Sequence, residues 1–504
     1  MSNSQNNRSV ELNDVQGLVR FGYRHLTEAC LLLLRVKDLA AARAWLAKVP
    51  VTSAVKVDPL PQTALHVAFT SEGLNVLGVA PELCEQFSSE FISGMASDAA
   101  GARLLGDVGA NDPGNWRWGV GERMPHVTVL LYARSGRLAE WEQEIEAQYA
   151  SGFVRIERLS TSDMQGVEPF GFIDGISQPQ LDWERKRPMR DQDQIEYSNI
   201  SCLGEFLLGY PNEYGLYTPR PLLAPQRDPV GLLPRAEDKP DQMDLGRNGC
   251  YLVIRQLRQD VQGFWGELDQ QSEGNADLRE RLAAAMVGRR KNGEPLIMPN
   301  REVPYSISPP QWKLNEFTYD EDPQGLRCPL GAHIRRTNPR NSDLPPGARG
   351  ILSRLWRTLG FNAAARQQDL VASARFHRLL RRGRSFGADM ASASGTQSSP
   401  STETGIYFIC LVANIKRQFE FVQSAWLMGH KFAGLTEESD PLLGTRMRDA
   451  ANSPIDGFSI PQADGPDRRL RGLPQFVTVQ GGAYLFLPGI RALRYLVTMR
   501  GKGS

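Results

Sequence analysis

The chain is poor in the residues that most often hold metal ions. Its 504 residues include only six histidines and six cysteines. The cysteines are scattered and no two form a CxxC pair, which argues against a zinc ribbon or a thioredoxin-like redox pair. They stand at Cys30, Cys84, Cys202, Cys250, Cys328 and Cys410. Scattered thiols in a large chain are typical of a reducing compartment, where most serve as small buried hydrophobes.

Long apolar runs and net charge are also lacking. The longest apolar runs, such as residues 29–34, are far shorter than the about 20 residues that a bilayer requires. The N-terminal segment is polar and has no apolar core of the kind that secretory signals carry. Lys and Arg total 58 against 57 Asp and Glu, so no overall field attracts nucleic acid or an anionic membrane. The composition predicts a cytoplasmic protein that binds neither nucleic acid nor membrane.

Hydrophobic periodicity predicts two groups of strands and helices. In the first half, strands are expected over 27–36, 64–69, 126–133 and 153–159. Helices are expected over 38–49, 71–79 (capped by Ser71) and 138–150, and residues 80–125 form an inserted segment. In the second half, strands are expected over 249–257 and 405–415 and helices over 260–271, 276–290 and 418–429, with two short strands in 475–488. The order in the first half predicts a ferredoxin-like α+β unit, and the second half looks like a variation on it, although no sequence repeat indicates a duplication.

Among the six histidines, His333 is the candidate ligand. It lies in the segment CPLGAHIRRTNPR, between Pro329 and Pro339. One interpretation is an ordinary hydrogen-bonded structural histidine. The other is an axial metal ligand, and because no partner motif exists, a haem would then supply the remaining ligands. Arg335 and Arg336 would in that case pair with the haem propionates. The remaining histidines are expected to be structural or exposed, and His377 exposed on a basic helix.

Asp174 is an acid in apolar surroundings, within the segment EPFGFIDGISQPQ. It could cap its own backbone in an Asx turn. Alternatively, Gly171 and Gly175 let the backbone approach a flat ligand closely, and the carboxylate acts on a reaction centre as a general base.

The basic segment HRLLRRGRSFG also has more than one interpretation. It could be a solvated helix face or a strip that binds phosphate. A third possibility is that one arginine turns inward as a permanent cation beside a reactive anion. Nucleic-acid binding is not expected, since the segment has no interleaved aromatic residues.

Together and in this order, the three segments resemble the dye-decolorizing peroxidase family of haem peroxidases. GFIDGISQP is similar to the family's GxxDG segment, CPLGAHIRRTNPR to its proximal-histidine segment and LLRRGRSFG to its distal-arginine segment. The resemblance extends to DVQG near the N-terminus and VQGGAYLFLP near the C-terminus, so that it spans most of the chain. It departs from the family in a longer segment between His333 and Arg381, where 341–374 is expected to add a surface element.

The resemblance implies an α+β fold of two ferredoxin-like domains, 1–185 and 186–504, each an antiparallel sheet with peripheral helices. The two domains would hold one haem b per chain between them. It implies that His333 is the axial ligand of the iron, that Asp174 is the distal acid–base and that Arg381 is the distal cation. Asp440, in DPLLG, would accept the proximal imidazole N–H and strengthen the imidazole as a donor.

Further positions follow from the same resemblance. Ile406 and Phe408, two apart and therefore on one face of a strand, would wall the distal side, and Gly175 would lie beside the haem. Trp426 is either a relay for electrons from the surface or a tryptophan packed on a helix face. Arg384, a bulky cation two residues before the Phe386–Gly387 pair, would affect access to the site.

The function implied is reduction of hydrogen peroxide coupled to oxidation of dyes, phenolics or other aromatic one-electron donors. Because a carboxylate base stays ionised at low pH, an acidic optimum is expected. Absence of a signal makes the chain more similar to bacterial, cytoplasmic members of the family, either as a monomer or as a homo-oligomer. A haem-binding or haem-delivery protein with incidental peroxidase activity is the alternative. A hydrolase that uses Asp174 is a third possibility, but it lacks a nucleophile motif.

Overall fold

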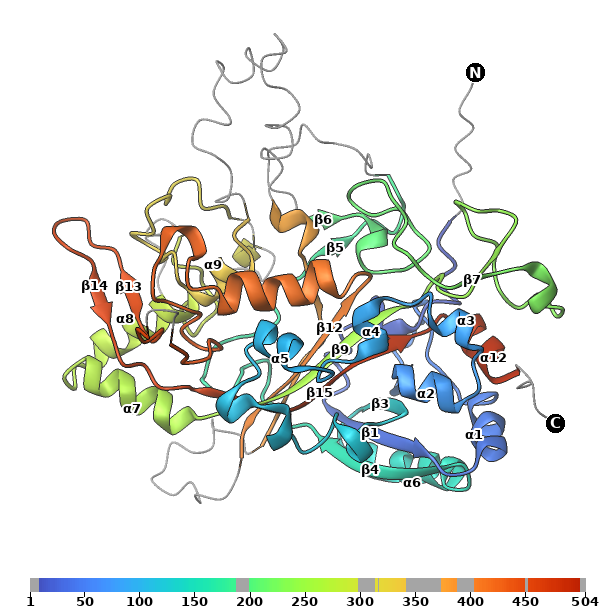
Figure 1. Cartoon of the computed structure of the whole chain (residues 1–504). Coiled ribbons are helices and arrows are strands. Elements are labelled where there is room, and N and C mark those ends of the chain that lie inside the picture. Colours follow the sequence, from blue (N-terminus) through green and yellow to red (C-terminus); the bar gives the residue numbers. More distant parts are fainter. Residues whose placement is uncertain are drawn as a thin grey trace, which may run out of the picture.

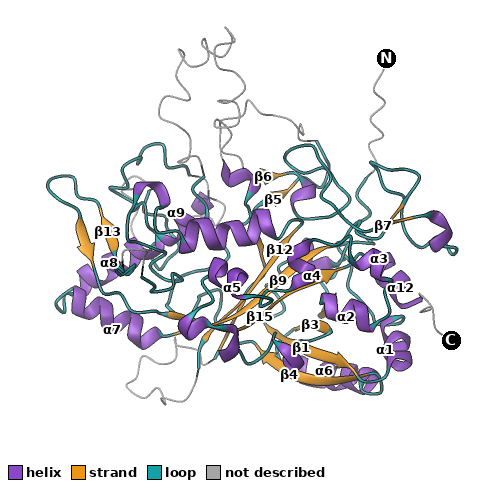
Figure 2. Ribbon diagram, viewed as in Figure 1, coloured by secondary structure: helices purple, strands orange, loops and turns teal. Residues whose placement is uncertain are grey.

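A computed structural model describes residues 9–186, 199–297, 313–315, 317–340, 373–387, 403–448 and 452–498. Within these residues, a sheet of nine strands runs through the centre of the molecule (Figure 1). Its strands follow the order β10-β12-β9-β15-β2-β3-β1-β4, and β11 also pairs with β12. Helices and loops cover both faces (Figure 2).

The N-terminal half of the sheet has the ferredoxin-like strand order. Its strands are β1 (Glu28–Val36), β2 (Thr63–Phe69), β3 (Val127–Ala133) and β4 (Phe153–Ser160), and all their pairings are antiparallel. Helix α1 (Leu39–Leu46) connects β1 to β2, and helix α6 (Leu138–Tyr149) connects β3 to β4. The Asp38 side chain accepts a hydrogen bond from the Ala41 amide and begins α1 as predicted.

The C-terminal half repeats this arrangement. Its strands are β9 (Cys250–Gln259), β10 (Leu380–Arg381), β11 (Arg384–Phe386), β12 (Gly405–Val412) and β15 (Val477–Leu487). Helices α7 (Val261–Gln271) and α8 (Ala276–Val287) follow β9. The two halves meet where Phe486 of β15 pairs with Phe69 of β2. The predicted α+β fold of two ferredoxin-like units is confirmed, whereas the boundary at 185/186 stays a prediction.

The remaining elements are short. Between β2 and β3 lie α2 (Ser71–Val76), α3 (Pro81–Cys84), α4 (Ser89–Ser93) and α5 (Ala99–Leu105). The later part contains α9 (His333–Thr337), a wide helical segment over Lys416–Glu420 and Val422–Met428, β13 (Phe458–Ile460), β14 (Arg468–Leu470) and α12 (Ile490–Thr498). Four two-residue strands complete the list: β5 (Gln180–Leu181), β6 (Ile200–Ser201), β7 (Leu222–Leu223) and β8 (Met243–Asp244). No helix in these described ranges is long and apolar enough to cross a membrane.

Two local predictions were wrong. Helix α2 is capped by Thr70 rather than Ser71, since the Thr70 hydroxyl accepts from the Gly73 amide at 3.0 Å. Residues 475–488 form one long strand rather than two short ones, with a shift of register between Val479 and Gly481. A bulge absorbs the glycine pair there, so the strand continues through it.

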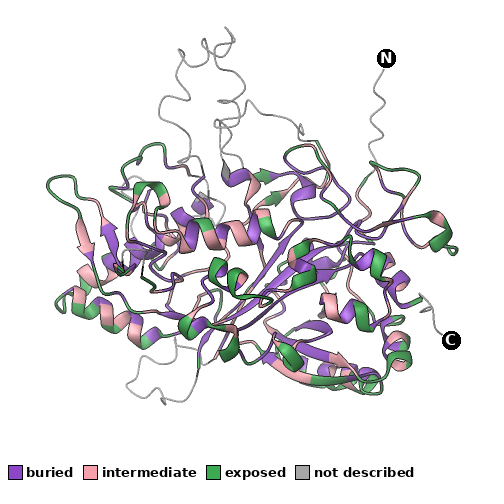
Figure 3. Cartoon of the chain, in the orientation of Figure 1, coloured by how far each residue is buried: buried purple, intermediate pink, exposed green. Residues whose placement is uncertain are grey.

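The strands are the most buried part of the molecule (Figure 3). On one face of the N-terminal half, apolar side chains of β1 pack with α1 and α6. On the other face, β1 packs with an N-terminal segment that includes Val15, Leu18 and Tyr23. All six cysteines are buried and free, as the scattered spacing predicted.

Candidate active site

The three segments singled out in the sequence meet at one cavity. Its lining includes Asp174 from the glycine-rich turn, His333 from the start of α9 and Arg381 from the end of β10. Ile406 and Phe408 line it from β12, one strand further into the sheet. Residues more than 200 positions apart are therefore brought together by sheet pairing.

His333 is held by a buried carboxylate. Its Nδ1 lies 3.0 Å from Oδ2 of Asp440, and the Asp440 side chain is 0% exposed. The other oxygen of Asp440 accepts from the amides of Leu442 and Leu443 at 3.0 and 2.8 Å. Burial acts to raise the pKa of Asp440, but the His333 charge and these bonds hold that pKa below its usual value. An ionised Asp440 fixes the proton on Nδ1, so Nε2 is the nitrogen that is left to act as a ligand.

Asp174 and Arg381 form an ion pair at the cavity. Nη1 of Arg381 lies 3.2 Å from Oδ1 of Asp174, and Nη2 donates to the Ser177 carbonyl at 3.3 Å. The Asp174 side chain is 43% exposed because it faces hollow space rather than packed protein. Burial acts to raise its pKa, but the charge of Arg381 and the Gly175 amide lower it below the usual value. Asp174 is therefore ionised across the neutral and mildly acidic range.

The backbone of the turn orients Asp174. The Asp174 amide donates to the Gly166 carbonyl at 2.9 Å, and the Gly175 amide donates to Oδ1 of Asp174 at 2.6 Å. Gly175 has φ +76°, and a Cβ there would meet Nη2 of Arg24 at 3.0 Å. Asp174 thus bonds its own local backbone, but to the next residue rather than two residues on as in an Asx turn. The same carboxylate oxygen also meets Arg381.

Glu168 is a residue of this site that the sequence analysis missed. Its carboxylate accepts from the amides of Phe170 and Phe172 at 3.1 and 3.0 Å and from Nε2 of Gln259 at 2.7 Å. Burial raises the pKa of Glu168 to about 7. It lines the same cavity as Asp174 and ties the turn to β9. The sequence did contain a signal for this role. Glu168 stands at the start of EPFGFIDG, and an acid before a tight turn can accept hydrogen bonds from the amides that follow.

Arg335 and Arg336 do not line the cavity. Nη1 of Arg335 lies 3.2 Å from Asp322, and Nη1 of Arg336 donates to the Trp426 carbonyl at 2.8 Å. Both are buried in the scaffold beneath α9, so the geometry gives no support to propionate pairing by either. Arg335 lies about 200° around the helix from His333 and so on another face. Arg336, three positions after His333, is held away from the cavity by its bonds to the carbonyls of Trp426 and Glu438.

Other arginines line the cavity instead: Arg255, Arg289, Arg340 and Arg378, in addition to Arg381. Burial lowers the pKa of Arg289 to about 10, and the charges of Arg340 and Arg381 act in the same direction. Arg289, Arg340 and Arg381 therefore lie close enough to act on one another, and an anionic group of a ligand at the cavity would be attracted to them.

Two further predictions concern the aromatic helix over residues 416–428. Trp426 is 8% exposed and packs edge-on against Phe421, their ring centroids 5.4 Å apart. The expectation that His377 is solvent-exposed on a basic helix was wrong, and the basic segment after it forms strands β10 and β11. The His377 ring stacks on Phe421 at 3.7 Å, and burial lowers the pKa of His377 to about 4. The segment 341–374 lies almost entirely outside the described residues.

The residues present fit a haem. In the described ranges, no group of three or more His, Cys, Asp or Glu side chains could hold a metal ion. His333 lines the cavity, and it would be the one protein ligand that a haem iron needs. Apolar residues such as Phe172, Ile406 and Phe408 line the cavity beside it. The arginine cluster supplies cations for propionates. A single imidazole, apolar walls and a cationic patch are what a haem requires of a protein.

Known proteins of one kind resemble the chain over nearly its whole length, although no family model matches it. A dye-decolorizing peroxidase of Mycetinis scorodonius is 27% identical over 527 residues, which cover 99% of this chain and 90% of that protein. The multifunctional dye peroxidase DyP2 of an Amycolatopsis species is 27% identical over 456 residues, with coverage of 86% and 82%.

Solved structures agree. A decolorizing peroxidase from Auricularia auricula-judae superposes with a TM-score of 0.70 at 25% identity, covering 97% of this chain and 100% of that one. A dye-decolorizing peroxidase solved with 2,6-dimethoxyphenol has a TM-score of 0.70 at 24% identity. In both sequence and fold, the chain is therefore similar to dye-decolorizing peroxidases over nearly its whole length.

Proposed function

We propose that the chain reduces hydrogen peroxide at this cavity and oxidises dyes or phenolic compounds in one-electron steps. The observation that carries the proposal is that His333, backed by Asp440, lines the same cavity as the Asp174–Arg381 pair. In this proposal one haem b binds per chain, His333 holds its iron, and Arg289 and Arg340 meet its propionates.

When bound, the haem would supply the iron at which peroxide is reduced and a conjugated ring that accepts electrons from donors. Asp174, ionised, takes a proton from the peroxide and returns it to the departing oxygen, which then leaves as water. Arg381 cannot deprotonate, and it stabilises the negative charge that develops during cleavage of the O–O bond. Asp440 keeps Nδ1 of His333 protonated and keeps the ring oriented.

The electron donors in this proposal are inferred from the proteins that the chain resembles. The curated proteins are named as peroxidases of dyes, and one solved relative holds 2,6-dimethoxyphenol. Each peroxide molecule, with two phenols, yields two waters and two phenoxyl radicals. Electron transfer through Trp426 stays a prediction, as do the cytoplasmic location and the state of assembly, monomer or homo-oligomer. A mere carrier of haem would have no use for a paired Asp174 and Arg381.

Spectroscopy of purified variants tests this function. His333→Ala should lose the Soret band, whereas Asp174→Asn and Arg381→Leu should keep it. Removing the Arg381 donor should slow the reaction with peroxide about 100-fold or more, as for other groups that stabilise charge in a transition state. His430→Ala, at a histidine that does not line the cavity, is the control and should match the parent. Full haem retention without His333, or an unchanged peroxide rate without Arg381, would refute the assignment.

A further inference from the structure

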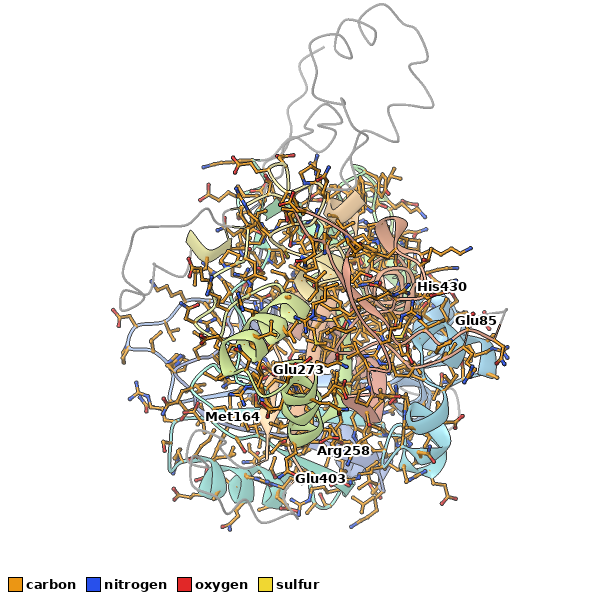
Figure 4. All side chains as sticks on the ribbon, turned by 90° about the vertical axis from the view of Figure 1, so that its left-hand side faces the viewer. Glu85, Met164, Arg258, Glu273, Glu403 and His430 are labelled. Carbon is orange, nitrogen blue, oxygen red and sulfur yellow. The ribbon has the colours of Figure 1, made fainter. Side chains whose placement is uncertain are left out.

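A second cavity opens beside the Asp174–Arg381 pair. Its volume is about 1180 Å³. The lining residues that it shares with the first cavity are Ile173, Asp174, Gly175, Gln178, Pro179, Arg381, Gly383 and Ile406. Its other walls come from the N-terminal segment 19–27, the loop 52–61, residues 162–167 and strand β11. Met164, which is labelled in Figure 4, belongs to this lining and lies on the other side of the molecule from His430 and Glu85. We call this space the cationic vestibule.

Basic residues dominate its charged lining. The cations are Arg20, Arg24, Lys56, Arg382 and Arg384 in addition to Arg381, whereas the acids are Asp163 and Asp174.

Two of these arginines hold the N-terminal segment through its carbonyls. Nε of Arg382 donates to the Leu18 carbonyl at 2.8 Å, and Nη2 of Arg384 donates to the Tyr23 carbonyl at 2.8 Å. Within the described chain, neither of them forms an ion pair with a carboxylate, nor does Arg20. Burial lowers the pKa of Arg382 to about 10, so it is still a cation at neutral pH. The wall therefore carries positive charge that the protein itself leaves largely uncompensated.

The rim of the vestibule is apolar. Val55, Val57 and Leu60 are 41%, 48% and 48% exposed, although large aliphatic side chains gain free energy from burial. Phe21 and Trp183 line the interior, and the Arg20 guanidinium lies 5.5 and 5.7 Å from their ring centroids. An apolar rim around a cationic wall matches a ligand that is a flat ring at one end and an anion at the other.

We propose that the cationic vestibule binds anionic aromatic electron donors, namely phenols that carry a sulfonate or carboxylate, and so sets the donor preference of the enzyme. This inference rests on the proposed function and deepens it. The anion meets Arg20, Lys56, Arg382 and Arg384. The ring packs on Val55, Leu60 and Trp183. Each bound donor gives up one electron and its phenolic proton to become a phenoxyl radical, so two donors balance the reduction of one peroxide to two waters.

Binding to haem-loaded protein without peroxide tests the site apart from turnover. The probes are 4-hydroxybenzenesulfonate and its uncharged counterpart 4-hydroxybenzenesulfonamide, measured by calorimetry at low salt. Lys56→Glu alone should weaken sulfonate binding about threefold and Lys56→Glu with Arg20→Gln about tenfold, because each change removes attraction at close range. Sulfonamide binding should change less than about twofold, and sulfonate binding should weaken with added salt. Lys48→Glu, the same charge change outside the vestibule, should match the parent.

The outcomes separate this inference from the proposed function. Unchanged sulfonate affinity in the double variant, or equal losses for both probes, would overturn the vestibule as an anion site. If the parent then still oxidises the sulfonamide with peroxide, the peroxidase function stands while the vestibule proposal fails. Selective loss of the sulfonate, together with a matching rise in its KM during turnover, supports the vestibule as the donor site.

Discussion

At the scale of single residues, the site depends on pairs in which one partner sets the protonation of the other. Asp440 orients His333, Arg381 lowers the pKa of Asp174, and Glu168 is a buried acid whose pKa is raised instead. The pKa values of Asp440 and Asp174 are lowered and that of Glu168 is raised. Glu168 accepts from neutral amides and forms no ion pair within the described residues.

Asp440→Asn tests the carboxylate behind His333. The neutral amide makes the imidazole a weaker donor, so we expect haem to dissociate about 10–100-fold faster and the reduction potential of the iron to rise. Haem transfer to an acceptor protein and a redox titration measure the two effects. Asp322→Asn, at a buried acid paired with Arg335, is the control, and it should lower stability without a shift in potential.

Asp174 predicts the pH dependence of the reaction with peroxide. Its pKa is below the usual value of about 4, so the base form persists from neutral pH down to about pH 4 and is lost as the pH falls further. The rate constant should therefore be level over that range and fall below it with the uptake of one proton. Arg381→Leu removes the cation and should move the fall to higher pH. A break near pH 6 in the parent would exclude Asp174 as the base.

Glu168 predicts an opposite dependence for stability. Its pKa of about 7 in the folded chain exceeds the value of about 4.3 in unfolded chains, so folding is penalised increasingly as the pH rises from 5 to 8. Glu168→Gln removes the charge. Relative to the parent, the variant should gain on the order of 2 kcal/mol between pH 5 and pH 8. Urea unfolding at both pH values measures the difference, and parallel curves for the two proteins would contradict it.

At the scale of elements, β15 shows how closely the strands and the connecting segments are packed. A Cβ on Gly481 would lie 2.5 Å from Nε1 of Trp118, which is 1% exposed and donates to Gln256 at 2.8 Å. The Trp118 indole therefore fits against the bulge in β15 only because residue 481 is a glycine, which has no side chain.

Gly481→Ala should cost about 1–3 kcal/mol, since an overpacked core must shift. Gly266→Ala is the matched control, because nothing lies within 4 Å of its Cβ position in α7. There alanine should stabilise the helix by about 0.5–1 kcal/mol. Denaturant midpoints of both variants measure the contrast. Changes of the same sign would show that crowding of residue 481 against Trp118 does not lower the stability.

At the scale of the whole molecule, the two half-sheets are joined at one register pair. Phe486 of β15 is 0% exposed and packs edge-on against Phe87, with ring centroids 4.9 Å apart. It also pairs with Phe69 across the junction. The cavity residues come from both halves, so the junction sets the position of Asp174 relative to His333.

Phe486→Ala should lower the free energy of unfolding by about 3–5 kcal/mol, because it leaves a void at the junction. We expect the variant to release haem more readily as well, since the two halves hold the cavity between them. Thermal unfolding followed by both the Soret band and far-ultraviolet circular dichroism measures this. Leu39→Ala, at a position 39% exposed, is the control and should change stability little.

The amino-acid sequence by itself predicted the main strands and helices of both halves, but not β10, β11, β13, β14 or α12. It also singled out Asp174, His333 and Arg381, which line one cavity. Alternating or continuous apolar runs specify strands locally, and the segments around Asp174, His333 and Arg381 carry their chemistry in short motifs. The sequence did not determine where Arg335 and Arg336 point, that His377 is buried, or that β15 is continuous. Those outcomes depend on contacts between residues far apart in the chain, such as Arg336 with the carbonyl of Trp426.

Only the tertiary structure decided that Glu168 belongs to the site and that a cationic vestibule lies beside it. Arg20 and Lys56 precede Arg382 and Arg384 by more than 300 residues, and no local pattern predicts that they face one space. Pairing of β10 and β11 with β12 brings the C-terminal cations against the N-terminal segment. Burial and charge are properties of that assembled space, which is why the chemistry could be predicted from motifs whereas the shape of the site could not.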